Sequence, residues 1–98
     1  MRAKTLYPNS AYHNINLNSD RNAALDASKH FLDQYYGPVF GPQMVEAWTA
    51  AGTPRQCADD LRKLIDAGAK EITLRITSWD QQDQFQRLVH EVLPLVNK

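Results

Sequence analysis

Apolar residues recur every three or four positions in several segments of the chain, a spacing that predicts amphipathic helices. The first helix is expected from about Asp20 to Tyr36, with Asn18-Ser19-Asp20 supplying a side-chain oxygen to cap its first turn. Gly37-Pro38 ends it, because proline cannot continue the helical hydrogen bonds. The face expected to be buried comprises Ala24, Leu25, Ser28, Phe31, Leu32 and Tyr35.

Thr53-Pro54-Arg55-Gln56 is the clearest start signal in the chain. Thr53 at the N-cap and Gln56 at the third helical position predict a capping box, in which each side chain bonds to the other residue's backbone N–H. Gly68 is expected to end this helix. The predicted buried face comprises Cys57, Ala58, Leu61, Leu64 and Ile65, and the face toward water comprises Asp59, Asp60, Arg62, Lys63 and Asp66.

Ser78-Trp79-Asp80-Gln81 predicts a second capping box, which opens the last helix. Asp80 and Asp83 suit the positive end of the helix dipole better than an acid–base pair, since no nucleophile or base lies near them in the sequence. Pro94 should kink the final turn, because it lacks a backbone N–H. The predicted buried face comprises Phe85, Leu88, Val89, Val92, Leu93 and Val96.

A shorter helix is predicted after Gly41-Pro42, passing through Met44, Val45 and Trp48. Ala50-Ala51-Gly52 is expected to close it. Its amphipathic spacing favours a core position for Trp48.

Two segments alternate between apolar and polar residues, which predicts strands at Tyr12–Leu17 and Glu71–Ile76. Helices separate them, so we expect βα units and a parallel pair, because parallel strands need a long crossover. The predicted fold class is α/β, with two parallel strands and about four helices. Residues 1–11 are expected to form a flexible lead-in, and residues 12–98 a single βα-type domain.

Composition narrows the possible functions. The chain has 98 residues and a net charge of +0, which favours one domain and excludes a basic nucleic-acid footprint. It contains neither an apolar stretch of about 18 residues nor a signal-peptide core, so we expect a cytoplasmic protein without a membrane partner. Cys57 has no second cysteine to pair with, and the three histidines lack metal-ligand spacing, so no metal site is expected.

No catalytic motif stands out. Cys57 lies near a helix N-terminus, which can lower a thiol pKa, but its apolar face favours a small buried hydrophobe. Trp79 directly follows the second strand, where barrel enzymes place substrate-facing groups; a packed junction explains that position equally well.

The segment Trp48–Ala58, continued by Leu61 and by Asp66-Ala67-Gly68-Ala69, resembles the C-terminal region of luciferase-like flavin-dependent monooxygenases. In that family, a capped helix opens with the motif Gly-Thr-Pro or Gly-Ser-Pro. It leads through an Ala-Gly-Ala turn into the last strand, here Glu71–Ile76. Glu91-Val92-Leu93-Pro94 is similar to the family's closing tail. The resemblance covers residues 12–97, which correspond to the final quarter of a family member.

This resemblance implies a TIM barrel that binds reduced FMN or a deazaflavin at the carboxyl ends of its strands. Tyr12–Leu17 would be the seventh strand and Glu71–Ile76 the eighth, which makes this chain a partial (βα) barrel. The first six strands and the family's catalytic motifs have no counterpart here, so the resemblance assigns no catalytic residue. The residues it places near cofactor or substrate are Asn16, Asn18, Arg75, Ser78 and Trp79.

Two functional hypotheses follow. The first is a C-terminal fragment or truncated member of this oxidoreductase family, catalytically incomplete and binding no flavin by itself. The second is a non-catalytic interaction module that oligomerises through its exposed sheet, since two strands leave open edges. The expected partner is a second copy, forming a dimer, or a chain carrying the rest of the barrel. A small enzyme acting at Arg75, Trp79 and Asp80 is a third, weaker alternative.

Overall fold

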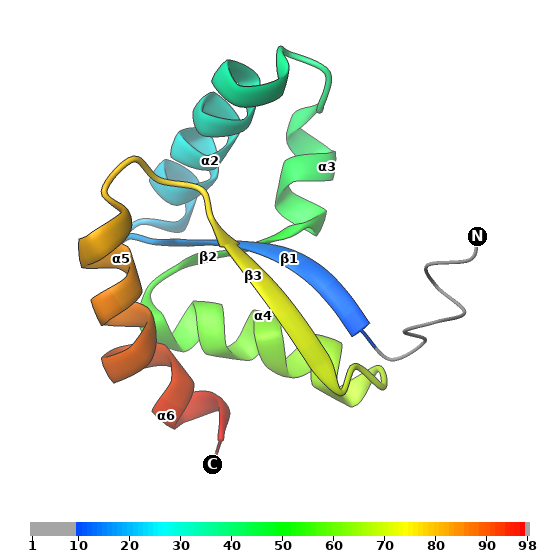
Figure 1. Ribbon diagram of the computed structural model, residues 1–98, viewed down its shortest axis with the longest axis vertical. Coiled ribbons are helices and arrows are strands. Elements are labelled where there is room, and N and C mark those ends of the chain that lie inside the picture. The colour runs from blue at the N-terminus through cyan, green and yellow to red at the C-terminus, as the bar shows by residue number, and fades with distance from the viewer. Residues whose placement is uncertain (1–9, 98) are drawn as a thin grey trace.

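A three-stranded parallel sheet forms the centre of the computed structural model, which describes residues 10–97 (Figure 1). Its strands are β1 (Ser10–Leu17), β2 (Thr49–Gly52) and β3 (Glu71–Ile76), in the order β2-β1-β3. β1 is therefore the central strand, and both predicted strands pair directly and in parallel. Most of the predicted lead-in, residues 1–9, lies outside the described residues.

Helices cover both faces of this sheet (Figure 1). On one face lie α2 (Arg21–Tyr36) and α3 (Pro42–Ala47). The other face carries α4 (Pro54–Asp66) and the C-terminal helix, which consists of α5 (Gln81–Arg87), the π-helical turn η1 (Leu88–Val92) and α6 (Leu93–Val96).

The arrangement is that of a small doubly wound α/β domain. In a (βα) barrel, consecutive strands are neighbours and all helices lie outside the sheet. Here β2 and β3 lie on opposite sides of β1, and helices pack on both faces. The α/β class and the parallel strands are confirmed, whereas the finer expectation of a partial barrel is not.

The third strand, β2, was not expected. The sequence predicted that Ala50-Ala51-Gly52 closes a helix; instead, Thr49–Gly52 pairs with β1 from Asn14 to Leu17. Four residues are too few for an alternating pattern to show, and alanine and glycine have low strand propensity. Pairing with β1 overrides that local preference. The first strand also begins at Ser10, two residues before the predicted start.

Two of the three predicted side-chain caps are confirmed, and α3 begins at Pro42 as expected. The Asp20 carboxylate accepts hydrogen bonds from the backbone N–H groups of Asn22 and Ala23. Thr53 and Gln56 form the capping box: Thr53 Oγ1 accepts from the Gln56 N–H at 3.2 Å, and Gln56 Oε1 accepts from the Thr53 N–H at 3.0 Å. Both helices therefore begin where side-chain oxygens satisfy their first free N–H groups.

The capping box predicted at Ser78–Gln81 does not form. Asp80 precedes α5 without a side-chain cap, and Ser78 Oγ accepts from the Asp80 N–H in a local turn. Gln81 donates instead to the carbonyls of Ile76 and Ser78. Because Gln81 is itself the first helical residue, its amide closes the end of β3 rather than reaching back to an N-cap N–H.

The main hydrophobic core lies between the sheet and the helices α4 to α6. A smaller cluster lies beneath α2 and α3, where Phe31, Leu32 and Val45 pack with Phe40. The buried members of the main core are Ile15, Leu17, Ala50, Cys57, Ala58, Leu61, Leu88, Val92 and Val96.

Only half of the apolar stripe predicted for the last helix is buried. Leu88, Val92 and Val96 join the core, whereas three residues at four-residue spacing are exposed: Phe85, Val89 and Leu93. The π-helical turn comes directly before the segment that holds Pro94. This irregularity agrees with the disturbance expected from a residue that lacks an N–H.

Candidate functional site

Asn16, at the carboxyl end of β1, is buried and fully engaged within the fold. Its Nδ2 donates to the Thr77 carbonyl at 2.6 Å. The Thr77 hydroxyl in turn lies 2.8 Å from Ser28 Oγ of α2 and 3.3 Å from the Ile15 carbonyl. This network joins β1, β3 and α2, so the Asn16 amide stabilises the end of the sheet rather than facing a ligand.

Gln84 completes the same end of the sheet from the opposite face. The Leu17 N–H donates to Gln84 Oε1 at 2.8 Å, and Gln84 Nε2 donates to the Leu17 carbonyl at 3.0 Å. The Gln84 side-chain amide thus makes the two hydrogen bonds that the backbone of a neighbouring strand residue would otherwise make. Sequence reasoning missed Gln84, although it lies four residues before Leu88 and on the same helix face as Val92.

Asn18 and Ser78 also serve local structure. Asn18 Oδ1 accepts from the Asp20 N–H at 2.9 Å, and the Asn18 N–H donates to the Gly52 carbonyl at 2.8 Å. Ser78 caps the turn that leads to Asp80. Three of the five residues that the resemblance placed near a flavin, namely Asn16, Asn18 and Ser78, are therefore hydrogen-bonded within the chain.

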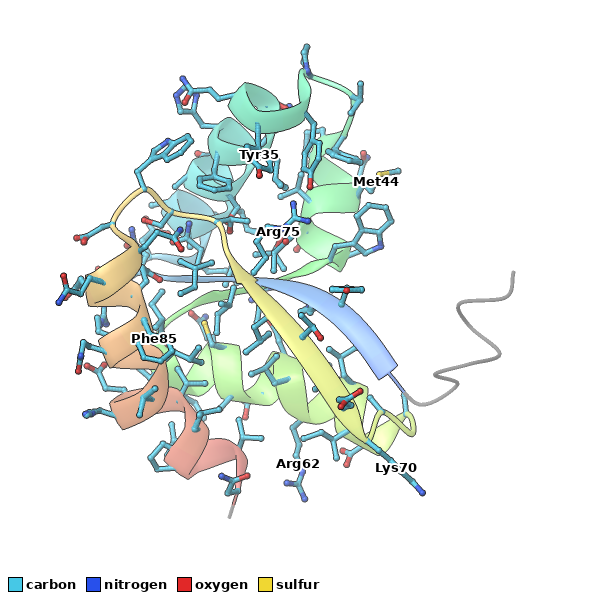
Figure 2. All side chains as sticks on the ribbon, in the orientation of Figure 1. Tyr35, Met44, Arg62, Lys70, Arg75 and Phe85 are labelled. Carbon is cyan, nitrogen blue, oxygen red and sulfur yellow. The ribbon has the colours of Figure 1, made fainter. Side chains whose placement is uncertain are left out.

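Arg75 and Trp79 are the two candidate residues that the structure brings together. Arg75 projects from β3 toward the space between α2 and α3 (Figure 2), with its guanidinium carbon 5.2 Å from the centre of the Tyr36 ring. The Trp79 ring centre lies 4.4 Å from that of Phe31. Both side chains line an open hollow of about 500 Å³, together with Phe31, Tyr35, Tyr36, Leu74, Ile76 and Gln81.

A second hollow, of about 330 Å³, lies on the other side of the Arg75–Tyr36 pair. We call it the aromatic hollow; it is lined by Tyr12, His13, Asn14, Leu32, Tyr36, Phe40, Val45, Trp48 and Arg75. Its wall is a series of edge-on ring contacts from Tyr36 to Phe40 at 5.8 Å and from Phe40 to Trp48 at 5.9 Å.

Trp48 is therefore not the core residue that its helical spacing predicted. It follows the last turn of α3, and nearly half of its surface (48%) is exposed. The α3 helix ends at Ala47, one residue earlier than the spacing implied. The change of direction into β2 leaves the indole at the rim of the aromatic hollow.

The aromatic hollow suits binding better than catalysis. Its walls are rings and aliphatic side chains, and Arg75 forms no ion pair with another residue between 10 and 97. Guanidinium groups stack on aromatic faces and still present N–H donors in their own plane. The N–H groups of Arg75 that remain in this plane are suited to bidentate contact with a carboxylate.

Asp60 was expected to face water, but it joins three elements. Its Oδ2 lies 2.7 Å from Arg21 Nη1 of α2 and accepts from the Ala51 N–H of β2 at 3.4 Å. Arg21 also donates to the Ala51 carbonyl at 2.8 Å. The hydrogen bond that Arg21 donates to the Asp60 carboxylate raises the pKa of Arg21, and the contact ties α4 to α2 and β2.

Burial shifts the pKa of two titratable groups beside the sheet, the buried Cys57 and the half-buried His13. Burial raises the pKa of the Cys57 thiol to about 12. Burial also lowers the pKa of His13, against the attraction of the Asp60 charge. Cys57 is thus a buried hydrophobe, as its apolar helix face predicted, and not a reactive thiolate.

Comparison of the chain with protein families, with curated proteins and with solved structures finds no match. Within residues 10–97, no group of three or more histidine, cysteine, aspartate or glutamate side chains is arranged to hold a metal ion. None of the described helices combines the length and apolar character needed to span a membrane.

Proposed function

We propose that this chain is the C-terminal βα part of a luciferase-like flavin-dependent monooxygenase, and that it acts only when the rest of a barrel is supplied. The observation that carries the proposal is the parallel pairing of β1 with β3, joined through the capped helix α4. This is the relation expected between the seventh and eighth strands. The Gly52-Thr53-Pro54 start and the bounds of Glu71–Ile76 agree with the motif order.

The residues of this chain do not by themselves fit a flavin. FMN and deazaflavins combine a flat ring with an anionic phosphate, and Asn16, Asn18 and Ser78 are bonded elsewhere. Phosphate sites in TIM barrels are built from several strand-end loops and a helix N-terminus. When bound in a complete barrel, the cofactor would supply the hydride and oxygen chemistry. This chain would contribute part of the wall.

Completion of a barrel also requires a rearrangement. Strand six would need the edge of β1 that β2 occupies, and α2 with α3 would leave the sheet face that they cover here. That rearrangement would have to break the small cluster of Phe31, Leu32 and Val45. It would also break the buried bond between Ser28 and Thr77 and the ion pair between Arg21 and Asp60.

Fragment complementation tests the proposal. A luciferase-like enzyme truncated after its sixth strand is co-expressed with this chain, and bound flavin and flavin-dependent oxygen consumption are measured. We expect both to require the two polypeptides together. Leu74→Pro, which removes an N–H from the outer edge of β3, should abolish recovery, whereas Lys70→Glu should not.

Two results would contradict the proposal. One is flavin that copurifies in equimolar amount with this chain alone. The other is a pair of soluble fragments that never recover flavin binding.

A second candidate function is that of a non-catalytic module that assembles with itself. The observation that favours it is the outer edge of β3, which has no neighbouring strand among the described residues. Ile72, Leu74 and Ile76 are only partly buried beside this edge. Light scattering tests the candidate, because a monomer that persists up to about 1 mM would exclude binding strong enough to matter.

A further inference from the structure

We propose that two copies of this chain pair through β3, antiparallel and with Thr73 on the two-fold axis, to form one continuous six-stranded sheet. This inference deepens the self-assembly candidate and rests on it. It names the edge, the register and the residue pairs that hold the dimer.

The hydrogen bonds already present in the sheet determine which groups point outward. The Thr77 N–H donates to the Ile15 carbonyl at 3.1 Å, so the backbone hydrogen-bonding groups of Thr77 face β1. Backbone direction alternates along a strand. The backbone N–H and C=O groups of Thr73 and Arg75 therefore point toward β1. Those of Ile72 and Leu74 point toward the open edge.

The outward groups permit antiparallel pairing about Thr73. Ile72 of each copy then lies opposite Leu74 of the other, and the two exchange both backbone hydrogen bonds. Thr73 lies opposite its own counterpart as a non-hydrogen-bonded pair, in which Cα atoms approach to about 4.5 Å.

Charge selects this register over its neighbours. With Thr73 on the axis, Glu71 of each copy lies opposite Arg75 of the other, which gives two opposite-charge pairs by symmetry. Moving the axis to Leu74 places Thr73 opposite Arg75, and moving it to Ile72 places Thr73 opposite Glu71, so neither neighbouring register has an opposite-charge pair. Opposite charges, Thr–Thr pairs and apolar pairs across strands all stabilise a sheet.

Among residues 10–97, no strand pairs with the outer edge of β3. Figure 1 shows β3 in front of the other strands, and no described helix crosses in front of it. Arg75 is stacked on Tyr36, which orients its side chain while leaving N–H donors for a carboxylate. Ile72 and Leu74 are partly exposed, so a partner strand would shield apolar surface as well as satisfy backbone groups.

A charge-exchange series on the full chain tests the register. Glu71→Arg and Arg75→Glu each place like charges opposite one another twice, and each should raise the dimer dissociation constant about tenfold by sedimentation or light scattering. The double variant, Glu71→Arg with Arg75→Glu, should restore the wild-type constant. Lys70→Glu changes net charge as much as Arg75→Glu does, but it lies opposite Ile76 and should have little effect. Thermal melting of each variant establishes that it is folded.

A cysteine on the axis provides an independent readout. Thr73→Cys places two thiols within the Cα distance that a disulfide allows, so mild oxidation should convert the chain to a covalent dimer. Ala27→Cys, exposed on α2, is the matched control and should remain monomeric on a denaturing gel. The native thiol, Cys57, is buried in both variants.

The outcomes separate the inference from the candidate function. A dimer that ignores both charge reversals and fails to cross-link through Thr73→Cys would overturn the register while leaving self-assembly in place. A chain that remains monomeric at every concentration would overturn both. Loss of dimer in the single variants, its return in the double variant, and the Thr73 cross-link together support the proposal.

Discussion

The two faces of the sheet differ in how completely they are covered. Toward α4 and the C-terminal helix, nine residues form one buried cluster around Ile15 and Leu61. Toward α2 and α3, the buried apolar cluster has only three members, and large rings such as Tyr36, Trp48 and Trp79 remain substantially exposed. The first face therefore contains most of the buried apolar packing, and the second leaves more aromatic surface exposed. A small α/β domain thus concentrates its packing on one side.

The strongest test of this comparison is the same truncation on each face. Leu61→Ala should cost about 3–5 kcal/mol of unfolding free energy, because tight packing around Leu61 cannot close the cavity. Leu32→Ala should cost about 2–3 kcal/mol, since Leu32 borders the aromatic hollow and its neighbours can relax. Urea denaturation measures both. Equal costs, or a larger cost at Leu32, would contradict the difference between the faces.

A smaller loss of unfolding free energy is expected when the Gln84 side-chain amide, which bonds to Leu17 at the end of β1, is removed. Gln84→Ala leaves the buried N–H and C=O of Leu17 without their side-chain partner and should cost about 1–3 kcal/mol. Gln86→Ala, on the exposed side of the same helix, should change stability by less than about 0.5 kcal/mol. If the two variants melt alike, the bonds from Gln84 contribute nothing to stability.

Alkaline pH should lower the stability of the folded domain, because the buried thiol of Cys57 resists ionisation. Its folded pKa of about 12 exceeds the value of about 8.5 expected in the unfolded chain. The resulting stabilisation is complete below about pH 8.5 and is lost as pH rises toward 12, because the unfolded thiol ionises first. Cys57→Ala should therefore show a shallower alkaline decline in melting temperature. Parallel declines in the two proteins would show that this thiol is not responsible.

The smallest effect is expected from the largest exposed ring of the aromatic hollow. Trp48→Ala should cost about 0.5–1 kcal/mol, well below the loss of about 3–5 kcal/mol typical of a buried tryptophan. Because the chain has two tryptophans, fluorescence of this variant also reports Trp79 alone. A cost above about 3 kcal/mol would show instead that Trp48 is packed as a core residue.

Local patterns in the sequence predicted the elements whose stability is local. The capping box at Thr53, the cap at Asp20 and the strand Glu71–Ile76 were all expected, because each depends on side chains within a few residues of one another. The strand β2 was not, since Thr49–Gly52 is a strand only through its pairing with β1.

The candidate site was harder to predict for the same reason. The family resemblance placed Asn16 and Asn18 near a ligand. The partner of Asn16, Thr77, lies 61 positions away and is brought to it only by folding, whereas the partner of Asn18, Asp20, belongs to the same local turn. Arg75 and Trp79 do meet at one hollow. The hollow's other rings come from α2, which no single motif connects to β3.

Because the Leu17 N–H donates to the Gln84 side chain, its hydrogen exchange reports on the attachment of the C-terminal helix to the central strand. Since the Leu17 N–H is bonded to α5 and not to another strand, its hydrogen can exchange with solvent only when that helix lifts away or the whole domain unfolds. One backbone proton at the end of the central strand therefore records how firmly the C-terminal helix is attached. Any partner that grips or displaces the C-terminal helix should alter the exchange rate at that position.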